Sequence, residues 1–200
     1  MSTRDAIIAA GARLFSEKGY EGMTMKQIAD AVGVTPPAVY AFFKNKEDLF
    51  GQIVKEIISS HFDVAAYHTE MLRDKPVKDQ LYGLIRALFE FQMREKLHTK
   101  IFTRLLLFPP KVFRINLKEE LNILAEREWE LLIGIFEKGM RSGELRPGDA
   151  SGYARAMLTL MDGLFWQMQR CEESVFWNSF ELSWRQFWKG IEPLAEENRR

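Results

Sequence analysis

Three histidines and one cysteine are the side chains of this chain best suited to acid–base chemistry, nucleophilic attack or metal binding, and they are His61, His68, His98 and Cys171. His61 and His68 share a helix face, but the nearby Asp63 does not. One thiol excludes an internal disulfide framework and a multi-cysteine metal site. Glycine-rich phosphate loops and a Gly-x-Ser-x-Gly elbow are also missing. We therefore expect solvated side chains here, no enzymatic activity, no metal and no cofactor.

A second spacing, between residues 25 and 43, points to nucleic acid. Ala29 lies four residues before Gly33, and Val39 lies six residues after it. A helix–turn–helix needs a small residue where its helices cross, a glycine with positive φ in the turn, and apolar residues that fix the interhelical angle. Further apolar anchors are Ile28, Val32 and Val34. Plain helix packing can produce the same spacing, so the surrounding residues must decide.

Helices must position these residues, because helical periodicity recurs along the chain and no segment alternates apolar and polar residues for long. Thr24, Thr35 and Asn45 can each cap a helix, and Gly19 can end one. The expected helices cover about 3–18, 24–31, a third from 35, 45–67, 74–96, 98–108, 117–141, 149–170 and 174–191. We predict an all-α fold of about nine helices, with a three-helix domain over 1–48 and a larger helical domain over 49–200.

The charge balance is neutral, with 28 basic and 28 acidic side chains among 200 residues. Duplex binding usually needs a basic surface, so this balance at first argues against nucleic acid. Between residues 23 and 46, however, Lys26, Lys44 and Lys46 face only Asp30. The electrostatic attraction to DNA phosphates would then come from this segment alone and not from the net charge of the chain. An apolar share of 46% is typical of a globular protein, and without a long apolar run or a secretory signal pattern we expect a cytoplasmic protein and no membrane partner.

Residues 4–49 resemble the TetR family of bacterial transcriptional regulators. The matching residues are Ile8, Ala10, Leu14, Phe15, Gly19, Tyr20, Thr24, Ile28, Ala29, Gly33, Val34, Val39, Tyr40, Phe43 and Lys46 to Leu49. The segment 39–46 is similar to the sequence that follows the family's recognition helix. The other 150 or so residues match only in the number and placement of helices. The resemblance implies a DNA-binding domain over 1–48 and a ligand-binding and dimerisation domain over 49–200.

The resemblance also implies roles for individual residues at the DNA backbone. Thr24 and Thr35 would cap helices whose N-termini meet phosphate oxygens, where N–H groups and the dipole favour an anion. Tyr40 would donate its hydroxyl to a phosphate. Lys46 would contact a phosphate from the start of the fourth helix.

One departure from the family concerns the recognition helix. It begins with two prolines and offers almost no side chain that could make bidentate bonds to guanine or adenine edges. We expect apolar contacts with thymine methyl groups from Pro36, Pro37, Ala38 and Ala41. Lys26 or Lys44 would add a few polar contacts, and groove shape would supply the remaining specificity.

Aromatic residues gather near the C-terminal end, where all five tryptophans lie within the last 72 residues. The last two helices carry apolar stripes that need burial. A family-like dimer would pair these helices across a dyad as a four-helix interface. The expected interface residues are Leu164, Trp166, Phe180, Trp184, Phe187 and Trp188. An intramolecular core is the alternative. The carboxylate of Asp162, which lies on an apolar helix, could find a polar partner at the dimer interface.

An effector pocket is expected among the helices between residues 76 and 141 and on the helix that follows. Methionine and aromatic side chains suit an adaptable apolar cavity, although each can equally be core. The candidate lining residues are Phe89, Met93, Phe102, Glu128, Trp129, Met161 and Phe165. Glu128 lies on an apolar stripe, where it could face a cationic or hydrogen-bonding ligand or instead make a salt bridge between helices.

Together these features predict a ligand-responsive transcriptional regulator, a repressor by resemblance. A homodimer would bind a palindromic double-stranded DNA operator and would be released by a small apolar or amphipathic effector. The alternative is a helical small-molecule-binding protein without sequence-specific DNA binding, which the two prolines of the recognition helix favour.

Overall fold

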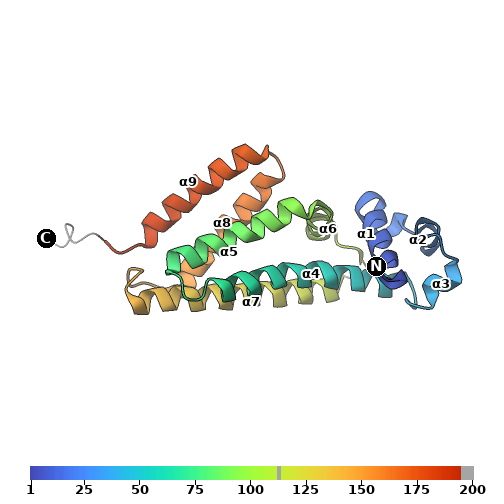
Figure 1. Ribbon diagram of the computed structural model, residues 1–200, viewed down its shortest axis with the longest axis horizontal. Coiled ribbons are helices and arrows are strands. Elements are labelled where there is room, and N and C mark those ends of the chain that lie inside the picture. The colour runs from blue at the N-terminus through green and yellow to red at the C-terminus, as the bar shows by residue number, and fades with distance from the viewer. Residues whose placement is uncertain (112–113, 195–200) are drawn as a thin grey trace. The chain divides into compact units, whose positions relative to one another are not determined.

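The computed structural model describes residues 1–111 and 114–194, and for 114–118, 120, 121, 124 and 125 it describes the backbone alone. Over these residues it contains nine helices and no strand, which confirms the predicted all-α fold (Figure 1). The helices are α1 (Thr3–Gly22), α2 (Met25–Val32), α3 (Pro36–Tyr40), α4 (Lys46–Met71), α5 (Val77–Arg94), α6 (Lys96–Leu107), α7 (Arg114–Ser142), α8 (Ala150–Met168) and α9 (Glu173–Ile191). Among the described residues, no helix is long and apolar enough to cross a membrane.

The chain divides into two compact units whose bounds differ from the expected boundary at residue 48. The first unit contains residues 1–64 and 90–120, and in it α6 packs against α1. The second unit contains residues 65–89 and the chain from residue 121 onward. The division into a DNA-binding and an effector-binding domain is a functional one, and it stays a prediction.

Helix α1 begins with a reciprocal cap. The Asp5 N–H donates to Ser2 Oγ at 3.2 Å, and the Ser2 N–H donates to Asp5 Oδ2 at 3.0 Å. Hydrogen bonding to the Asp5 carboxylate, first by the Ser2 backbone N–H and then by the Ser2 side chain, lowers the pKa of Asp5. The expected end at Gly19 is only partly right. Gly19 leaves helical geometry at φ 74° and ψ 178°, but the chain returns to helix until Gly22.

Aromatic rings fill the core of the first unit. The Phe15 and Tyr20 rings lie 4.8 and 5.0 Å from the ring of Phe50, which is fully buried. Arg104 of α6 places its guanidinium 5.9 Å from the centre of the Phe15 ring and against the kink at Gly19. Helix α6 is thereby fixed to α1 within this unit.

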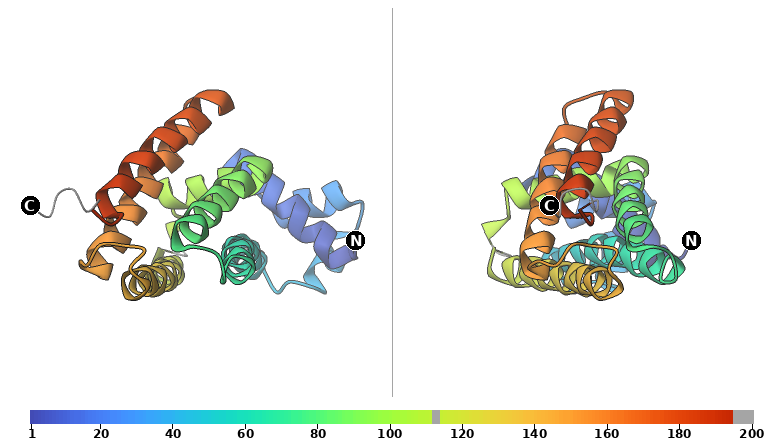
Figure 2. Two further views of the ribbon diagram at one scale, coloured as in Figure 1. Left: turned by 60° about the vertical axis from the view of Figure 1, so that its left-hand side comes forward. Right: turned by 90° about the vertical axis from the view of Figure 1, so that its left-hand side faces the viewer.

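In the second unit, α9 runs beside α8 (Figures 1 and 2), and its aromatic side chains contact those of α5. The Tyr82 ring lies 5.7 Å from Phe180 and 5.5 Å from Trp184, and its hydroxyl donates to Glu181. Burial is the main cause that raises the pKa of Tyr82. Arg86 adds an ion pair with Glu181 at 3.6 Å. Rings and polar bonds together hold α9 on α5.

Candidate nucleic-acid interface and effector region

The turn between α2 and α3 has the geometry that the sequence predicts. Gly33 adopts φ 77° and ψ 31°, and the N–H groups of Gly33 and Val34 both donate to the Ala29 carbonyl at 3.0 Å. Ala29 and Val39 are fully buried where the helices cross. A left-handed glycine thus reverses the chain, and the buried small residue lets α3 pack closely on α2. The outward side of α3 is left exposed.

Thr24 caps α2, as predicted. Its hydroxyl accepts the Gln27 N–H, and the Gln27 side chain accepts the Thr24 N–H, both at 3.2 Å. The first two N–H groups of a helix have no partner within it, so those of Met25 and Lys26 face outward from this end. Thr24 and Lys26 are both exposed. The N-terminus of α2 can therefore receive a phosphate oxygen.

The expected cap by Thr35 is wrong, because its side chain makes no hydrogen bond to α3. Pro36 and Pro37 occupy the first two positions and have no N–H to offer. The next N–H, from Ala38, donates at 2.9 Å to the Thr35 carbonyl oxygen. The start of α3 therefore lacks the N–H donors expected at a phosphate, although the exposed Thr35 hydroxyl could donate a hydrogen bond there.

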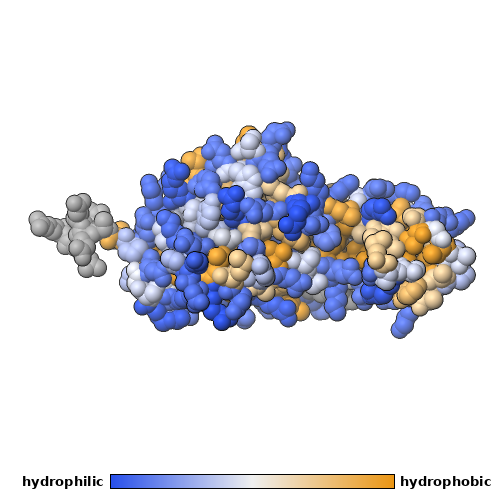
Figure 3. All heavy atoms as spheres, viewed as in Figure 1, coloured by the Kyte–Doolittle hydropathy of each residue, from blue (hydrophilic) through white to orange (hydrophobic). Residues whose placement is uncertain are grey.

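The outward surface of α3 and the residues after it is mostly uncharged, and orange apolar surface is visible over α2 and α3 in Figure 3. Pro37, Tyr40 and Ala41 are exposed, and Pro36 and Ala38 are half-buried. Phe42, which sequence reasoning missed, is 46% exposed beside Tyr40 at 52%. The sequence offers no clear signal for it, because adjacent residues can both be buried, as Leu49 and Phe50 are, whereas here only Phe43 is buried.

The lysines that follow differ in their surroundings. Asn45 caps α4 as predicted, since its Oδ1 accepts the Asp48 N–H at 2.8 Å. Lys44 is exposed. Lys46 is half-buried, with its ammonium 4.3 Å from the centre of the Tyr20 ring. Lys44 is thus the more accessible cation, and Lys46 would have to reach a phosphate from a position already stabilised by a cation–π contact.

The expected pocket residues fall into both compact units. Met93 and Phe102 belong to the first unit and are half-buried. Phe89 belongs to the second, where its ring packs 5.1 Å from Phe176 and 6.0 Å from Phe180. Phe89 is 2% exposed, so it is a core residue of the α5–α9 contact. An effector pocket lined by the remaining residues stays a prediction.

Within the second unit, Glu128 and Trp129 of α7 face α8. The Arg155 guanidinium lies 4.0 Å from the centre of the Trp129 ring. Burial, and then the nearby Glu128 carboxylate, raise the pKa of Asp162. Met161 is half-buried and Phe165 is buried. In the part of the chain that the structure describes, no group of three His, Cys, Asp or Glu side chains is placed to hold a metal ion.

The aromatic stripe of α9 is buried inside the protomer. Phe180, Trp184 and Trp188 are at most 7% exposed and face α5, and Leu164 of α8 is 3% exposed. Four of the six residues expected at a dimer interface are therefore core residues of this unit. Trp166 is exposed and Phe187 is half-buried, so both could still contact a partner.

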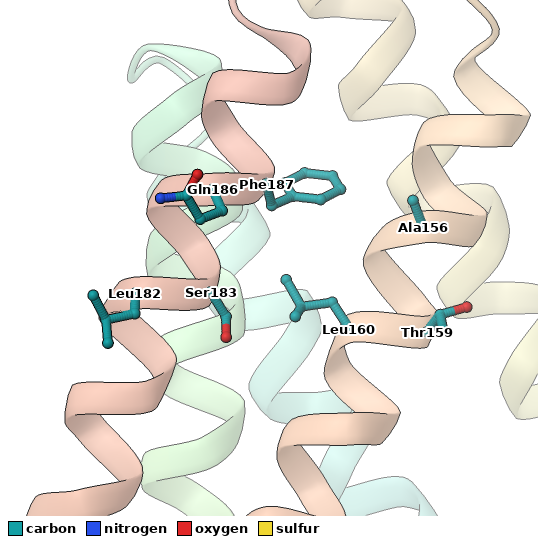
Figure 4. Close-up of a pocket in the computed structure, with 7 residues that line it drawn as sticks. All are labelled: Ala156, Thr159, Leu160, Leu182, Ser183, Gln186 and Phe187. Carbon is teal, nitrogen blue, oxygen red and sulfur yellow. The ribbon is translucent and has the colours of Figure 1, made fainter.

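A shallow apolar hollow lies between α8 and α9 on the side away from that core. It is lined by Ala156, Thr159, Leu160, Leu182, Ser183, Gln186 and Phe187. Figure 4 shows Leu160 and Phe187 pointing into the space between the two helices. Among the lining residues Leu182 is half exposed, at 50%. This α8–α9 face, and not the aromatic stripe, is the apolar surface that the two helices leave open.

Comparisons with known proteins give one consistent family. The family of bacterial regulatory proteins named tetR matches residues 7–53. The nucleoid occlusion factor SlmA of Mannheimia succiniciproducens is 26% identical over 185 residues, which are 92% of this chain and 82% of that protein. The fatty acid metabolism regulator protein of Bacillus subtilis is 26% identical over 152 residues, which are 76% of this chain and 75% of that protein.

The fold is also similar to that of a solved regulator. The crystal structure of the transcriptional regulator FadR from Bacillus subtilis, in complex with stearoyl-CoA, aligns with a TM-score of 0.70 at 22% identity and covers 94% of this chain and 99% of that one. The match at residues 7–53 contains the capped α2, the Gly33 turn and the exposed α3. The motif, the relatives along most of the chain and the shared fold lead to one conclusion: residues 7–53 match the tetR family of bacterial regulatory proteins, and the chain as a whole is similar to regulators of that family.

Proposed function

We propose that this protein binds a palindromic operator as a homodimer and is released from it, as a repressor, by a small apolar or amphipathic effector. The turn at Gly33 carries the proposal, because it leaves an exposed α3 beside the capped N-terminus of α2. A dimer would place two such helices in successive major grooves, about 34 Å apart. In this proposal residues 1–48 read DNA, and residues 49–200 bind the effector and the partner.

The effector would act by shifting a population of conformers, since it must bind the released conformer better than the DNA-bound one. One relative is a fatty acid metabolism regulator, and the solved FadR structure holds stearoyl-CoA. Both support an effector with a long apolar part.

Base readout in this proposal depends on apolar contacts. Pro36, Pro37, Ala38 and Ala41 stay candidates for thymine methyl groups, and Phe42 joins them by its exposure. Lys26 and Lys44 would add polar contacts.

Thymine methyl groups are therefore expected to matter in the operator. Replacing each contacted thymine by deoxyuridine removes about 0.8 kcal/mol of apolar contact, or about fourfold in affinity per methyl group. The measurement is a gel-shift titration with operators substituted one position at a time. Silent substitutions at every thymine, with guanine positions dominating specificity, would show that apolar readout is wrong.

Tyr40→Phe is expected to weaken binding to all DNA sequences alike. Losing the hydroxyl–phosphate bond costs about 1.5–3 kcal/mol in each subunit, or about 3–6 kcal/mol for the dimer. The slope of log affinity against log salt should not change, because tyrosine carries no charge. Lys46→Ala should instead lower that slope. The matched control is Tyr67→Phe, which changes another exposed tyrosine, on α4. A change of sequence preference with intact nonspecific affinity would contradict the phosphate role of Tyr40.

The second candidate is a helical small-molecule-binding protein without sequence-specific DNA binding. The missing N–H donors at Pro36 and Pro37 favour it. A gel shift with the DNA upstream of the protein's own gene, over a salt series, separates the two. Retention of a specific complex at salt that abolishes binding to unrelated DNA supports the regulator. Equal affinity for both DNAs at every salt concentration supports the alternative.

A further inference from the structure

Two polar atoms at the corner between α5 and α6 have no hydrogen-bond partner. They are Gln92 Oε1 and His98 Nδ1, and both are shielded from solvent. No other buried side-chain nitrogen or oxygen among the described residues shares this condition. The large majority of such side-chain atoms in native proteins have a partner, because leaving one unpaired destabilises the folded state. Two of them within seven residues of chain mark this corner as unusual.

The corner itself is firmly held, so the two atoms are not loose ends of a flexible loop. The Glu95 N–H donates to the Phe91 carbonyl at 2.8 Å, and the Thr99 hydroxyl donates to the Gln92 carbonyl at 2.7 Å. The His98 ring meets the Phe91 ring edge-on, with centres 6.4 Å apart. Backbone, hydroxyl and ring contacts therefore fix both residues.

Apolar side chains and one surface ion pair, Arg94 with Glu95, neighbour these two residues along the chain. Phe91, Met93 and Phe102 are half-buried on the same two helix ends, and Ile101 is fully buried. Glutamine carries no charge, and an imidazole nitrogen can donate or accept according to its tautomer. A carboxylate or phosphate in a buried site would need a buried cation, but Arg94 and Lys96 at this corner are exposed, and Arg94 already pairs with Glu95 at 3.2 Å. The complementary ligand group is an uncharged hydroxyl, amide or ester.

We propose that Gln92 and His98 are the polar anchor of the effector site, and that they hold an uncharged hydrogen-bonding group of a mainly apolar molecule. This inference rests on the proposed function, in which the chain binds a small effector. It moves the polar part of that site from Glu128 on α7 to the α5–α6 corner.

The test compares decan-1-ol, decanamide and decanoate by isothermal titration calorimetry on the full chain. Decan-1-ol or decanamide should bind, and decanoate should bind more weakly. Gln92→Leu and His98→Phe should each weaken the neutral probes about tenfold, which corresponds to one hydrogen bond. In a chain with ¹⁵N-labelled histidine, the Nδ1 signal of His98 should shift on adding the alcohol. Unchanged affinity in both variants, stronger binding of decanoate, or no binding of either neutral probe would overturn the proposal.

The melting temperatures of the same variants provide a second test of the proposal. An unpaired polar atom replaced by an apolar group should leave the melting temperature of the free chain unchanged or higher. The matched control is Gln80→Leu, also on α5, because Gln80 Nε2 donates to the carbonyls of Arg73 and Lys75 at 3.0 and 2.6 Å. Gln80→Leu should lower the melting temperature. If Gln92→Leu lowers the melting temperature as much as Gln80→Leu does, Gln92 Oε1 already has a hydrogen-bond partner in the free chain, such as an ordered water. That result would overturn the proposal.

Direct binding to the free chain keeps this inference separate from the proposed function. If the neutral probes bind through Gln92 and His98 while no operator complex forms, the regulator proposal fails and the anchor stands. If a specific operator complex forms and neither variant changes probe binding, the anchor fails and the regulator proposal stands.

Discussion

Gly19→Ala is expected to lower the free energy of unfolding by about 2–4 kcal/mol. At φ 74° and ψ 178°, Gly19 occupies a backbone region that residues with a Cβ avoid, and forcing one into it costs about 1–3 kcal/mol. An alanine Cβ would also lie 2.5 Å from Arg104 Nη2. The guanidinium can swing away, but it then loses its contact with the Phe15 ring, which contributes about 0.5–1 kcal/mol.

Urea unfolding monitored by circular dichroism measures this loss, and Gly33→Ala is the matched control. Gly33 also has positive φ, but no atom lies within 4 Å of the position of an added Cβ, so only the left-handed strain of about 1–2 kcal/mol applies. Arg104→Ala alone should cost less than 1 kcal/mol. In the double variant Gly19→Ala/Arg104→Ala the losses should be less than additive. Equal losses for Gly19→Ala and Gly33→Ala would contradict a role for Arg104 at the kink.

The kink at Gly19 also shows where sequence reasoning stops. A glycine after a run of helix predicts an end, and the φ of 74° confirms that the helix breaks there. The return to helix until Gly22 depends on α6, whose Arg104 packs against the kink from 85 residues further along the chain. Local patterns carry no information about that contact. Caps at Thr24 and Asn45 were predictable because both partners lie within three residues.

Thr35 marks a second limit, because the same reasoning failed there. Threonine before a helix predicts a cap, but a cap needs a free N–H in the first turn. Two prolines remove two of those groups, and Ala38 donates to the backbone. The sequence shows the two prolines but leaves the N–H of Ala38 for a cap, so the cap is rejected only by the structure, in which that N–H donates to the Thr35 carbonyl oxygen.

The aromatic stripe of α9 is a harder case. A stripe of Phe180, Trp184 and Trp188 requires burial, and burial by another helix or by a second chain satisfies it equally. Helix α5 offers a matching apolar side, with Leu81 and Leu84 both buried. Which helix covers which stripe depends on the packing of the whole unit. Periodicity could therefore predict that the stripe is buried but not that α5 buries it.

Neutral charge makes dimerisation important to the proposed function. Residues 1–50 carry six basic and six acidic side chains, so few phosphates are neutralised per subunit. The structure sharpens this point, since Lys46 lies on Tyr20 and α3 lacks free N–H groups at its first two positions. One subunit alone should bind DNA weakly. When two subunits are joined and one has bound, the DNA-binding domain of the second is held near the DNA at high effective concentration.

We propose that the homodimer forms through the open α8–α9 face, so Leu182→Arg is expected to separate the dimer and to weaken operator binding strongly. Leu182 lines the α8–α9 face and is 50% exposed, so the protomer should tolerate the change. A two-fold interface duplicates every substitution and buries both guanidinium groups without partners. An unpaired buried charge costs about 3 kcal/mol or more, which corresponds to about hundredfold weaker dimerisation. Sedimentation velocity over a concentration series measures the dimer, and a gel shift measures the operator complex.

Leu107→Arg is the matched control, because Leu107 at the end of α6 is also a half-exposed leucine, at 52%. It adds the same charge at a place outside the α8–α9 face, and it should leave both measurements unchanged. The affinity for the operator should fall by at least as large a factor as the dimer association constant, because a single DNA-binding domain with no net charge has little affinity for DNA of its own. A Leu182→Arg protein that stays dimeric would place the interface elsewhere. A monomeric Leu182→Arg protein that binds the operator with unchanged affinity would show that one subunit suffices, against the charge argument.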